Sequence, residues 1–419
     1  MIAEIISIGD ELLIGQVINT NASWMGEILN KHGIKVNKIS MISDDKDEII
    51  KAITSGFVNA DLILMTGGLG PTKDDITKHT LCEFFDSKLV FNELAYLRIK
   101  EIFRLRNFKV TEVNKAQADL PDNCIVIPNS NGTASGMWFE HDGKILVSMP
   151  GVPFEMKPMM ESEVIPRIKT KFNTQVIIHK TIMTQGLGES FLAKRIEDWE
   201  NNLPSNIKLA YLPQPGIVRL RLSAIGDDRV KCEQIISDLV KKLTQSIGDL
   251  IFGYDDILLE EAVGQKLTEN NLSISTAESC TGGYLAHLIS SVAGSSNYFK
   301  GSIIAYSNVI KEKELNVPSE ILINEGAVSE SVVKQMAMNV RAKFETDYAI
   351  AISGIAGPGG GTEDKPVGTT WIALAGPNGV ISKRFHFGEH RGRNIRRAAL
   401  SALFILFKAI EAKSKFKNQ

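Results

Sequence analysis

Residues 276–283 (TAESCTGG) hold the side chains best suited to acyl chemistry in this chain. They follow a β-branched apolar stretch and precede an amphipathic one, so the pattern predicts a turn between a strand and a helix. Backbone N–H groups at a helix N-terminus are unpaired. A serine there, Ser279, could attack an acyl carbon while neighbouring amides hold the oxyanion. Helix capping by Ser or Thr is the alternative interpretation of the same residues.

Two further strand ends carry residues that could join Ser279 in one pocket. A strand predicted at 303–306 ends on Tyr306, with Lys311 five residues later, and a third strand leads into the glycine-rich segment 353–361. The C-terminal ends of parallel strands face one crevice, so we expect these groups to converge. A lysine with a lowered pKa, or a Tyr–Lys pair, could activate the serine. The alternatives are a solvated strand-end tyrosine, a solvated helix-face lysine and a plain surface loop.

Residues 255–415 closely resemble the C-terminal domain of the CinA family (competence/damage-inducible protein A). The resemblance is carried by 276–283, 305–308, 326–330, 352–361 and 365–371. It implies deamidation of nicotinamide mononucleotide to nicotinate mononucleotide and ammonia, with no cofactor. It also implies Ser279 as nucleophile, with Tyr306 and Lys311 as its activating partners.

Such a substrate would need donors for its amide oxygen and its 5′-phosphate. Loop residues would supply N–H groups and the start of the last helix would supply arginines, although solvated basic residues are the alternative there. The expected substrate-binding residues are Cys280, Thr281, Gly282, Gly283, Ser353, Gly354, Gly357, Gly359, Gly360, Arg391 and Arg396.

A second glycine loop, residues 66–75 (TGGLGPTKDD), follows a predicted strand in the first third of the chain. Its amides suit a phosphate, and its paired aspartates suit a divalent metal that bridges phosphates. Asp10 lies in another acidic turn at a strand end. The alternative for Asp74 and Asp75 is capping of a helix N-terminus. The expected phosphate-site residues are Gly67, Gly68, Gly70, Thr72 and Asp75, with Asp10, Asp74 and Asp75 as metal ligands.

Together with 129–136 and 150–156, these motifs make residues 1–170 resemble the molybdopterin-binding fold at the N-terminus of CinA proteins. Asp75 and Asp10 match the acidic residues of that fold. The resemblance implies ADP-ribose pyrophosphatase activity with Mg²⁺ or a similar metal. Because such a loop can bind phosphate without cleaving anything, a pterin-binding protein without catalysis is the alternative.

The 419 residues are too many for one ordinary core and predict two to four domains, and the pattern of strands and helices along the chain divides it into three parts. Residues 1–172 are predicted to form an α/β domain with a parallel sheet, 173–254 a small α+β (KH-like) module, and 255–419 a second α/β domain. We expect the middle module to have little core of its own and to end in a linker at 253–256. Its lack of reactive residues suggests a joining role, which favours a homodimer.

A formal net charge of −2 gives no general attraction to nucleic acid or to anionic membranes. The four cysteines lie far apart, as free thiols in a reducing compartment would. No signal peptide or membrane span is evident, so we expect a cytoplasmic protein whose partners are small nucleotides. The rival class is a binding or regulatory protein of competence or of the DNA-damage response.

Overall fold

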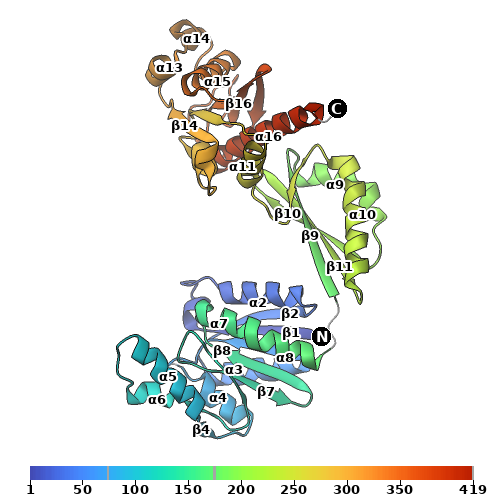
Figure 1. Ribbon diagram of the computed structural model, residues 1–419, viewed down its shortest axis with the longest axis vertical. Helices are drawn as coiled ribbons and strands as arrows, with labels where there is room; N and C mark the ends of the chain where they lie inside the picture. The colour runs from blue at the N-terminus through green and yellow to red at the C-terminus, as the bar shows by residue number, and fades with distance from the viewer. Residues whose placement is uncertain (73–74, 173–175, 418–419) are drawn as a thin grey trace. The chain divides into compact units, whose positions relative to one another are not determined.

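The computed structural model describes residues 1–72, 75–172 and 176–417 (Figure 1). The chain forms two compact units. The first contains Met1–Ile178 with Ile225–Cys232, and the second contains His179–Ala224 with Glu233–Gln419. No helix among the described residues is both long and apolar enough to cross a membrane.

The N-terminal sheet has the strand order β2-β1-β3-β8-β7-β6. Its first four strands are parallel and the last two antiparallel, so the expected parallel sheet is in fact mixed. The strands are β1 (Ile2–Ile8), β2 (Lys35–Ile42), β3 (Leu62–Thr66), β6 (Ile125–Ile127), β7 (Gly136–His141) and β8 (Lys144–Met149). The apolar, β-branched stretches at 2–8, 35–42 and 61–65 predict strands, and all three strands are present.

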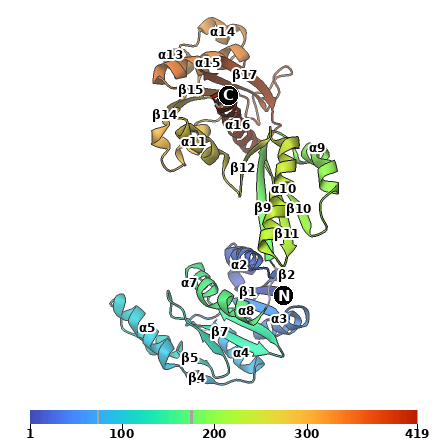
Figure 2. The ribbon, with the colours of Figure 1, turned by 45° about the vertical axis from the view of Figure 1, so that its right-hand side comes forward.

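Alternate residues of the central strands face two helical layers, as the period of two in a strand requires. Ile5 and Leu64 face α2, α7 and α8, whereas Ile6 and Ile63 face α3, α4 and α5. Figure 2 shows the sheet between these layers. The helices are α1 (Asp10–Leu13), α2 (Thr20–Lys31), α3 (Lys46–Asn59), α4 (Thr77–Phe84), α5 (Glu93–Leu105), α6 (Glu112–Ala116), α7 (Pro153–Met159), the π-helical turn η1 (Met160–Val164) and α8 (Ile165–Lys171). A short ladder joins β4 (Leu89–Phe91) to β5 (Asp119–Pro121).

The middle module is a four-stranded sheet in the order β10-β11-β9-β12 with two helices. It contains β9 (Val176–Gln185), α9 (Glu189–Asn201), β10 (Ile207–Gln214), β11 (Ile217–Gly226), α10 (Arg229–Ile247) and β12 (Ile251–Tyr254). Two expectations were wrong. Residues 253–254 belong to β12, which pairs with β9, and are not a linker. The module also has a substantial core, which includes Leu192, Leu220, Leu222 and Leu243, each fully buried.

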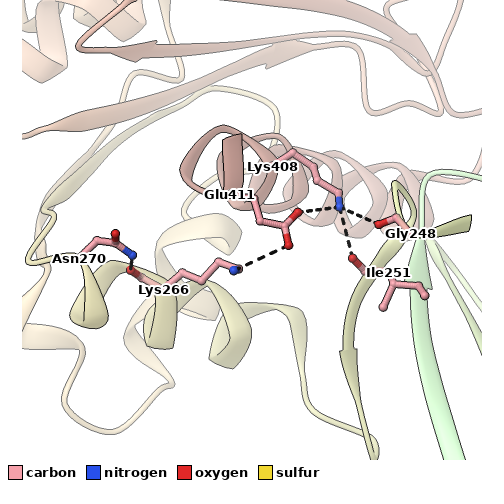
Figure 3. A network of polar contacts seen from close by, with 6 residues as sticks. All are labelled: Gly248, Ile251, Lys266, Asn270, Lys408 and Glu411. Carbon is pink, nitrogen blue, oxygen red and sulfur yellow. Dashed lines mark hydrogen bonds and ion pairs between the residues drawn. The ribbon is translucent and has the colours of Figure 1, made fainter. Parts of the chain in front are cut away.

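Within the second unit, the middle module is fixed to the C-terminal domain through Lys408 (Figure 3). Its Nζ donates to the carbonyl oxygens of Gly248 (3.2 Å) and Ile251 (3.4 Å) and to the Glu411 carboxylate (2.9 Å). Gly248 directly follows α10, so the lysine satisfies a carbonyl near that helix's C-terminus. Glu411 also lies 3.8 Å from Lys266.

The C-terminal sheet has the order β14-β13-β15-β16-β17. The first three strands are parallel and the last two form an antiparallel hairpin extension. The strands are β13 (Ile274–Glu278), β14 (Phe299–Ile304), β15 (Tyr348–Gly354), β16 (Thr369–Gly376) and β17 (Gly379–His386). The turn-forming residues at 376–379 predict a hairpin between 369–375 and 381–387, and this hairpin is present. The strand expected to reach Tyr306, in contrast, ends at Ile304.

Two helical layers cover this sheet. Isoleucines such as Ile274 and Ile350 face α11, α12 and α16, whereas alanines such as Ala277 and Ala349 face α15 and its neighbours. The small side chains leave room for α15 against the sheet, because packing must fill the space between layers. The helices are α11 (Leu259–Glu269), α12 (Tyr284–Ser290), the 3₁₀ turn η2 (Ser295–Asn297), α13 (Asn308–Leu315), α14 (Ser319–Asn324), α15 (Glu330–Phe344) and α16 (Arg391–Lys417).

Candidate functional site

Ser279 and Lys311 meet at the C-terminal ends of β13 and β14. The Lys311 Nζ lies 3.0 Å from the Ser279 Oγ, 2.7 Å from the Ala305 carbonyl oxygen and 3.5 Å from the Tyr306 carbonyl oxygen. Ser279 directly follows β13, as the sequence predicted, and its N–H donates to the Ile352 carbonyl of β15 (2.9 Å). The serine is therefore held between the two neighbouring strand ends.

The position of Lys311 follows from the local fold after β14. Ser307 caps α13 by accepting a hydrogen bond from the Ile310 N–H, and Lys311 comes one turn into that helix. Its side chain is 1% exposed. Burial lowers the pKa of Lys311 below its ordinary value of 10.5, and no carboxylate contacts the amine among the described residues. A lysine in these surroundings can lose its proton and serve as a base.

The three partners of the Lys311 amine differ in what they can do. The carbonyl oxygens of Ala305 and Tyr306 can only accept hydrogen bonds, whereas the Ser279 hydroxyl can also donate. In a neutral amine, the two hydrogens would serve the carbonyls and the lone pair would face the serine proton. This arrangement suits proton transfer from Ser279 to Lys311.

The expected row of unpaired amides at the start of α12 is largely occupied. The Glu278 carboxylate accepts hydrogen bonds from the N–H groups of Gly283 (3.1 Å), Leu285 (3.0 Å) and Ala286 (2.8 Å). Sequence reasoning assigned no role to Glu278, although an acidic residue just before a helix is a capping signal. Within the described chain, the amides of Cys280 and Thr281 make no hydrogen bond, and these two could hold an oxyanion.

Tyr306 lies at the rim of the site instead of beside the nucleophile. Its side chain is 60% exposed, and its hydroxyl accepts a hydrogen bond from Arg391 Nη2 (3.4 Å). Arg391 Nη1 also donates to the Gly357 carbonyl (2.8 Å). No hydrogen bond joins the Tyr306 hydroxyl to Ser279 in the described part of the chain. The tyrosine and arginine thus link the second strand end, the third loop and α16.

The other expected substrate-binding residues fall into two groups. The side chains of Cys280 and Ser353 are engaged within the protein. The Cys280 thiol belongs to the hydrophobic core, where burial raises its pKa to about 12. The Ser353 hydroxyl donates a hydrogen bond to the Ala327 carbonyl. Gly354 is part of the β15–β16 ladder, and Arg396 contacts the Tyr284 hydroxyl (3.4 Å). The exposed residues, with backbone open to solvent, are Gly282, Gly359 and Gly360.

A second glycine turn follows β3 in the N-terminal unit. Gly67 and Gly68 have φ angles of 109° and 63°, and a Cβ on Gly68 would lie 2.0 Å from the Thr77 Oγ1. Only glycine fits such a position without strain. Asp75 accepts hydrogen bonds from the N–H (2.9 Å) and Oγ1 (2.6 Å) of Thr72, and a Cβ on Gly70 would meet the Asp75 carboxylate.

Carboxylates gather beside this turn, including one that sequence reasoning missed. The Asp10 N–H donates to the Asp44 carboxylate (3.3 Å). Burial raises the pKa of Asp44, and the negative charges of Asp10, Glu11 and Asp75 raise it further. Oxygen ligands suit Mg²⁺. However, no group of three His, Cys, Asp or Glu side chains among the described residues is arranged to hold a metal ion, and Asp74 lies outside those residues. The metal site expected from Asp10, Asp74 and Asp75 therefore stays a prediction.

Comparison with known proteins gives matches along the whole chain. Residues 4–170 match the description "Probable molybdopterin binding domain", 179–253 match "Damage-inducible protein CinA KH domain", and 257–410 match "CinA C-terminal domain". These matches agree with the three-part architecture of an N-terminal α/β region, a KH-like middle module and a C-terminal α/β region.

Full-length relatives are also found. A "CinA-like protein" of Flavobacterium psychrophilum is 49% identical over 413 residues, which cover 98% of this chain and 99% of the relative. A "Putative competence-damage inducible protein" of Caldicellulosiruptor saccharolyticus is 41% identical over 410 residues, with the same coverage. The solved structure of competence/damage inducible protein CihA from Agrobacterium tumefaciens is 35% identical and covers 36% of this chain and 93% of its own, with a TM-score of 0.36.

Proposed function

The chain belongs to the CinA family, and we propose that its C-terminal domain is a serine amidase that converts nicotinamide mononucleotide to nicotinate mononucleotide and ammonia. The observation that carries the proposal is the 3.0 Å approach of the buried Lys311 Nζ to the Ser279 Oγ. A base beside a hydroxyl at a strand end is the arrangement that covalent acyl transfer requires. No cofactor takes part in this chemistry.

In the proposed reaction, Lys311 takes the Ser279 proton as the serine oxygen bonds to the carboxamide carbon. The carbonyl electron pair moves to oxygen, where the free amides of Cys280 and Thr281 can stabilise it. The C–N bond then breaks and the nitrogen leaves as ammonia with the proton from Lys311. Water, deprotonated by Lys311, attacks the resulting ester, and the lysine returns the proton to Ser279.

The rim residues support a nucleotide as substrate. Tyr306 offers an exposed aromatic side chain at the rim of the site, and Arg391 brings a permanent positive charge beside it. A planar guanidinium matches phosphate oxygens well. We therefore assign Tyr306 to substrate binding and leave the activation of Ser279 to Lys311, which changes the role expected for the tyrosine.

Ammonia release from nicotinamide mononucleotide by the purified protein tests the proposal. We expect turnover with the mononucleotide and much weaker turnover with free nicotinamide or nicotinamide riboside, which lack the phosphate. The Ser279→Ala protein serves as the blank. Absence of ammonia from the wild-type protein would refute the assignment and favour a binding or regulatory role in competence or DNA damage.

For the N-terminal unit, the glycine turn favours a second candidate function, the binding of a phosphate group such as that of ADP-ribose. More specifically, we propose that the unit hydrolyses ADP-ribose with the help of a divalent metal such as Mg²⁺. Calorimetry with ADP-ribose, with and without Mg²⁺, tests binding. Detection of AMP and ribose 5-phosphate tests cleavage, and binding without products would make the unit a binding module.

We further propose that the protein is a cytoplasmic homodimer. Its reaction would be one step of pyridine-nucleotide salvage. The four cysteines are free thiols, which fits a reducing compartment. Light scattering at micromolar concentration measures the assembly state. A mass near 46.1 kDa, that of a single chain, would contradict the dimer.

A further inference from the structure

Glu278 is a fully buried carboxylate directly before the nucleophile. It ends β13, the strand that pairs with both β14 and β15, and its side chain is 0% exposed. Burying a carboxylate is costly unless it is well hydrogen-bonded. A role beyond packing is therefore expected for the Glu278 carboxylate.

The partners of Glu278 all belong to the first turn of the next helix. One oxygen accepts from the N–H groups of Gly283 and Leu285, and the other accepts from Ala286. Gly283, the N-cap residue of α12, has a φ of 98° and provides no side-chain cap. The strand-end carboxylate takes over that task and lies at the positive end of the helix dipole.

These bonds close the chain on itself around the nucleophile. Glu278 is tied to residues 283–286, so the four residues between them form a short loop with fixed ends. Inside it, the Gly282 N–H donates to the Ser279 carbonyl (3.1 Å) and the Tyr284 N–H donates to the Thr281 carbonyl (3.0 Å). The loop is thereby held in a shape that aims the Ser279 hydroxyl at Lys311.

The same bonds select which amides remain free. Three N–H groups at the start of α12 are occupied by the carboxylate, while those of Cys280 and Thr281 stay unpaired among the described residues. The Thr281 hydroxyl is also buried without a partner in the described chain. Free donors are thus confined to the part of the loop next to Ser279.

We infer that Glu278 is a positioning residue for the proposed serine chemistry, which orients Ser279 and reserves the Cys280 and Thr281 amides for the oxyanion. This inference rests on the proposed amidase function. Glu278 does not touch the reacting atoms; it acts through the loop it closes. A displacement of about 1 Å in such a loop can cost roughly 100-fold in rate.

Glu278→Gln tests the inference, because it keeps the size and shape of the side chain but turns an NH₂ group toward backbone N–H donors. We expect kcat for nicotinamide mononucleotide to fall roughly 10- to 100-fold with KM nearly unchanged. Asp347→Asn is the matched control. Its carboxylate accepts from the N–H and Oγ of Ser273 (both 2.8 Å) at the other end of the same strands. That variant should lose stability but keep kcat.

A second measurement separates the inference from the proposed function. The labelling rate of Ser279 by a fluorophosphonate probe reports how the hydroxyl is oriented without any nucleotide. Slower labelling in Glu278→Gln than in Asp347→Asn, at temperatures where both are folded, supports positioning, even if the wild-type protein releases no ammonia. Wild-type labelling and kcat in a folded Glu278→Gln protein would overturn the inference and leave Glu278 a helix cap.

Discussion

The serine turn after β13 and the glycine turn after β3 use the same topological device with different results. Each lies at the C-terminal end of a buried strand and leads to a helix. At the serine turn, a buried lysine reaches the hydroxyl and a buried carboxylate fixes the loop. At the glycine turn, Asp75 turns back onto Thr72. The first turn is organised around a buried serine–lysine contact, whereas the second is organised around an aspartate–threonine contact.

A glycine turn at a strand end places backbone donors in position but does not by itself supply a base or a nucleophile. The lysine at the serine turn comes from α13, the helix after the neighbouring strand β14. No comparable base approaches a nucleophile at the glycine turn among the residues described there. The two sites should therefore respond independently to substitution.

Ser279→Ala should produce the largest effect. It removes the proposed nucleophile, so we expect kcat for deamidation to fall at least about 1,000-fold. Ammonia release measures this loss, and ADP-ribose binding to the N-terminal unit should stay unchanged in the same protein. Substantial ammonia release from the variant would show that another group attacks the amide.

Replacement of Lys311 should come next in size. Lys311→Met removes the base but keeps much of the side chain's volume, and we expect a loss of roughly 1,000-fold in kcat. Lys311→Arg should be inactive as well, because a guanidinium does not release its proton at accessible pH. Steady-state kinetics of both variants, with melting curves to verify folding, check this. An active arginine variant would rule out the lysine as base.

The pH dependence follows from the lowered pKa of Lys311. The neutral amine is the active form, so kcat/KM should rise with pH through that lowered pKa and level off before pH 10.5. Stability should also increase with pH between the folded-state pKa and 10.5, because the unfolded chain binds the proton more tightly in that window. Lys311→Met should lack this gain in melting curves. A rate profile that rises only near pH 10.5 would contradict a depressed pKa.

Asp75→Ala probes the other turn. We expect ADP-ribose affinity to fall at least about 10-fold, because the Thr72 contacts that shape the loop are lost. Deamidation should stay within about two-fold of wild type, as expected for independent sites. Asp122→Asn is a suitable control, since that carboxylate accepts from Ser87 and Lys88 elsewhere in the same unit. Loss of deamidation in Asp75→Ala alone would mean that the two sites are coupled.

Lys408→Met should have the smallest effect on activity. It removes the bonds to Gly248 and Ile251 that fix the middle module to the C-terminal domain, with an expected loss of about 1–2 kcal/mol in the free energy of unfolding. Denaturant melts measure it, and kcat should not change. Lys343→Met, which loses bonds to Glu314 within the C-terminal domain, is the control. A fall in kcat with Lys408→Met only would assign the middle module a role in catalysis.

The sequence predicted the positions of β1, β2 and the serine turn because strong apolar periodicity and glycines mark them. It did not predict Glu278 as a cap, since the bonds depend on how α12 folds back over the strand end. Tyr306 was expected in a strand because Ile303 and Ile304 precede it, yet the ladder ends at Ile304. Asp44 was missed because Asp10 and Asp75, whose charges act on it in the folded protein, lie more than 30 residues away in the sequence on either side.

Trapping with hydroxylamine shows whether Ser279 forms an acyl intermediate. If Ser279 forms an ester with the substrate, hydroxylamine will compete with water for it and yield the hydroxamate of nicotinate mononucleotide. We predict that the share of hydroxamate rises with hydroxylamine concentration, and that Ser279→Ala forms none above the uncatalysed level. Ammonia release with nicotinate mononucleotide as the only product at every hydroxylamine concentration would indicate direct attack by water and contradict the serine mechanism.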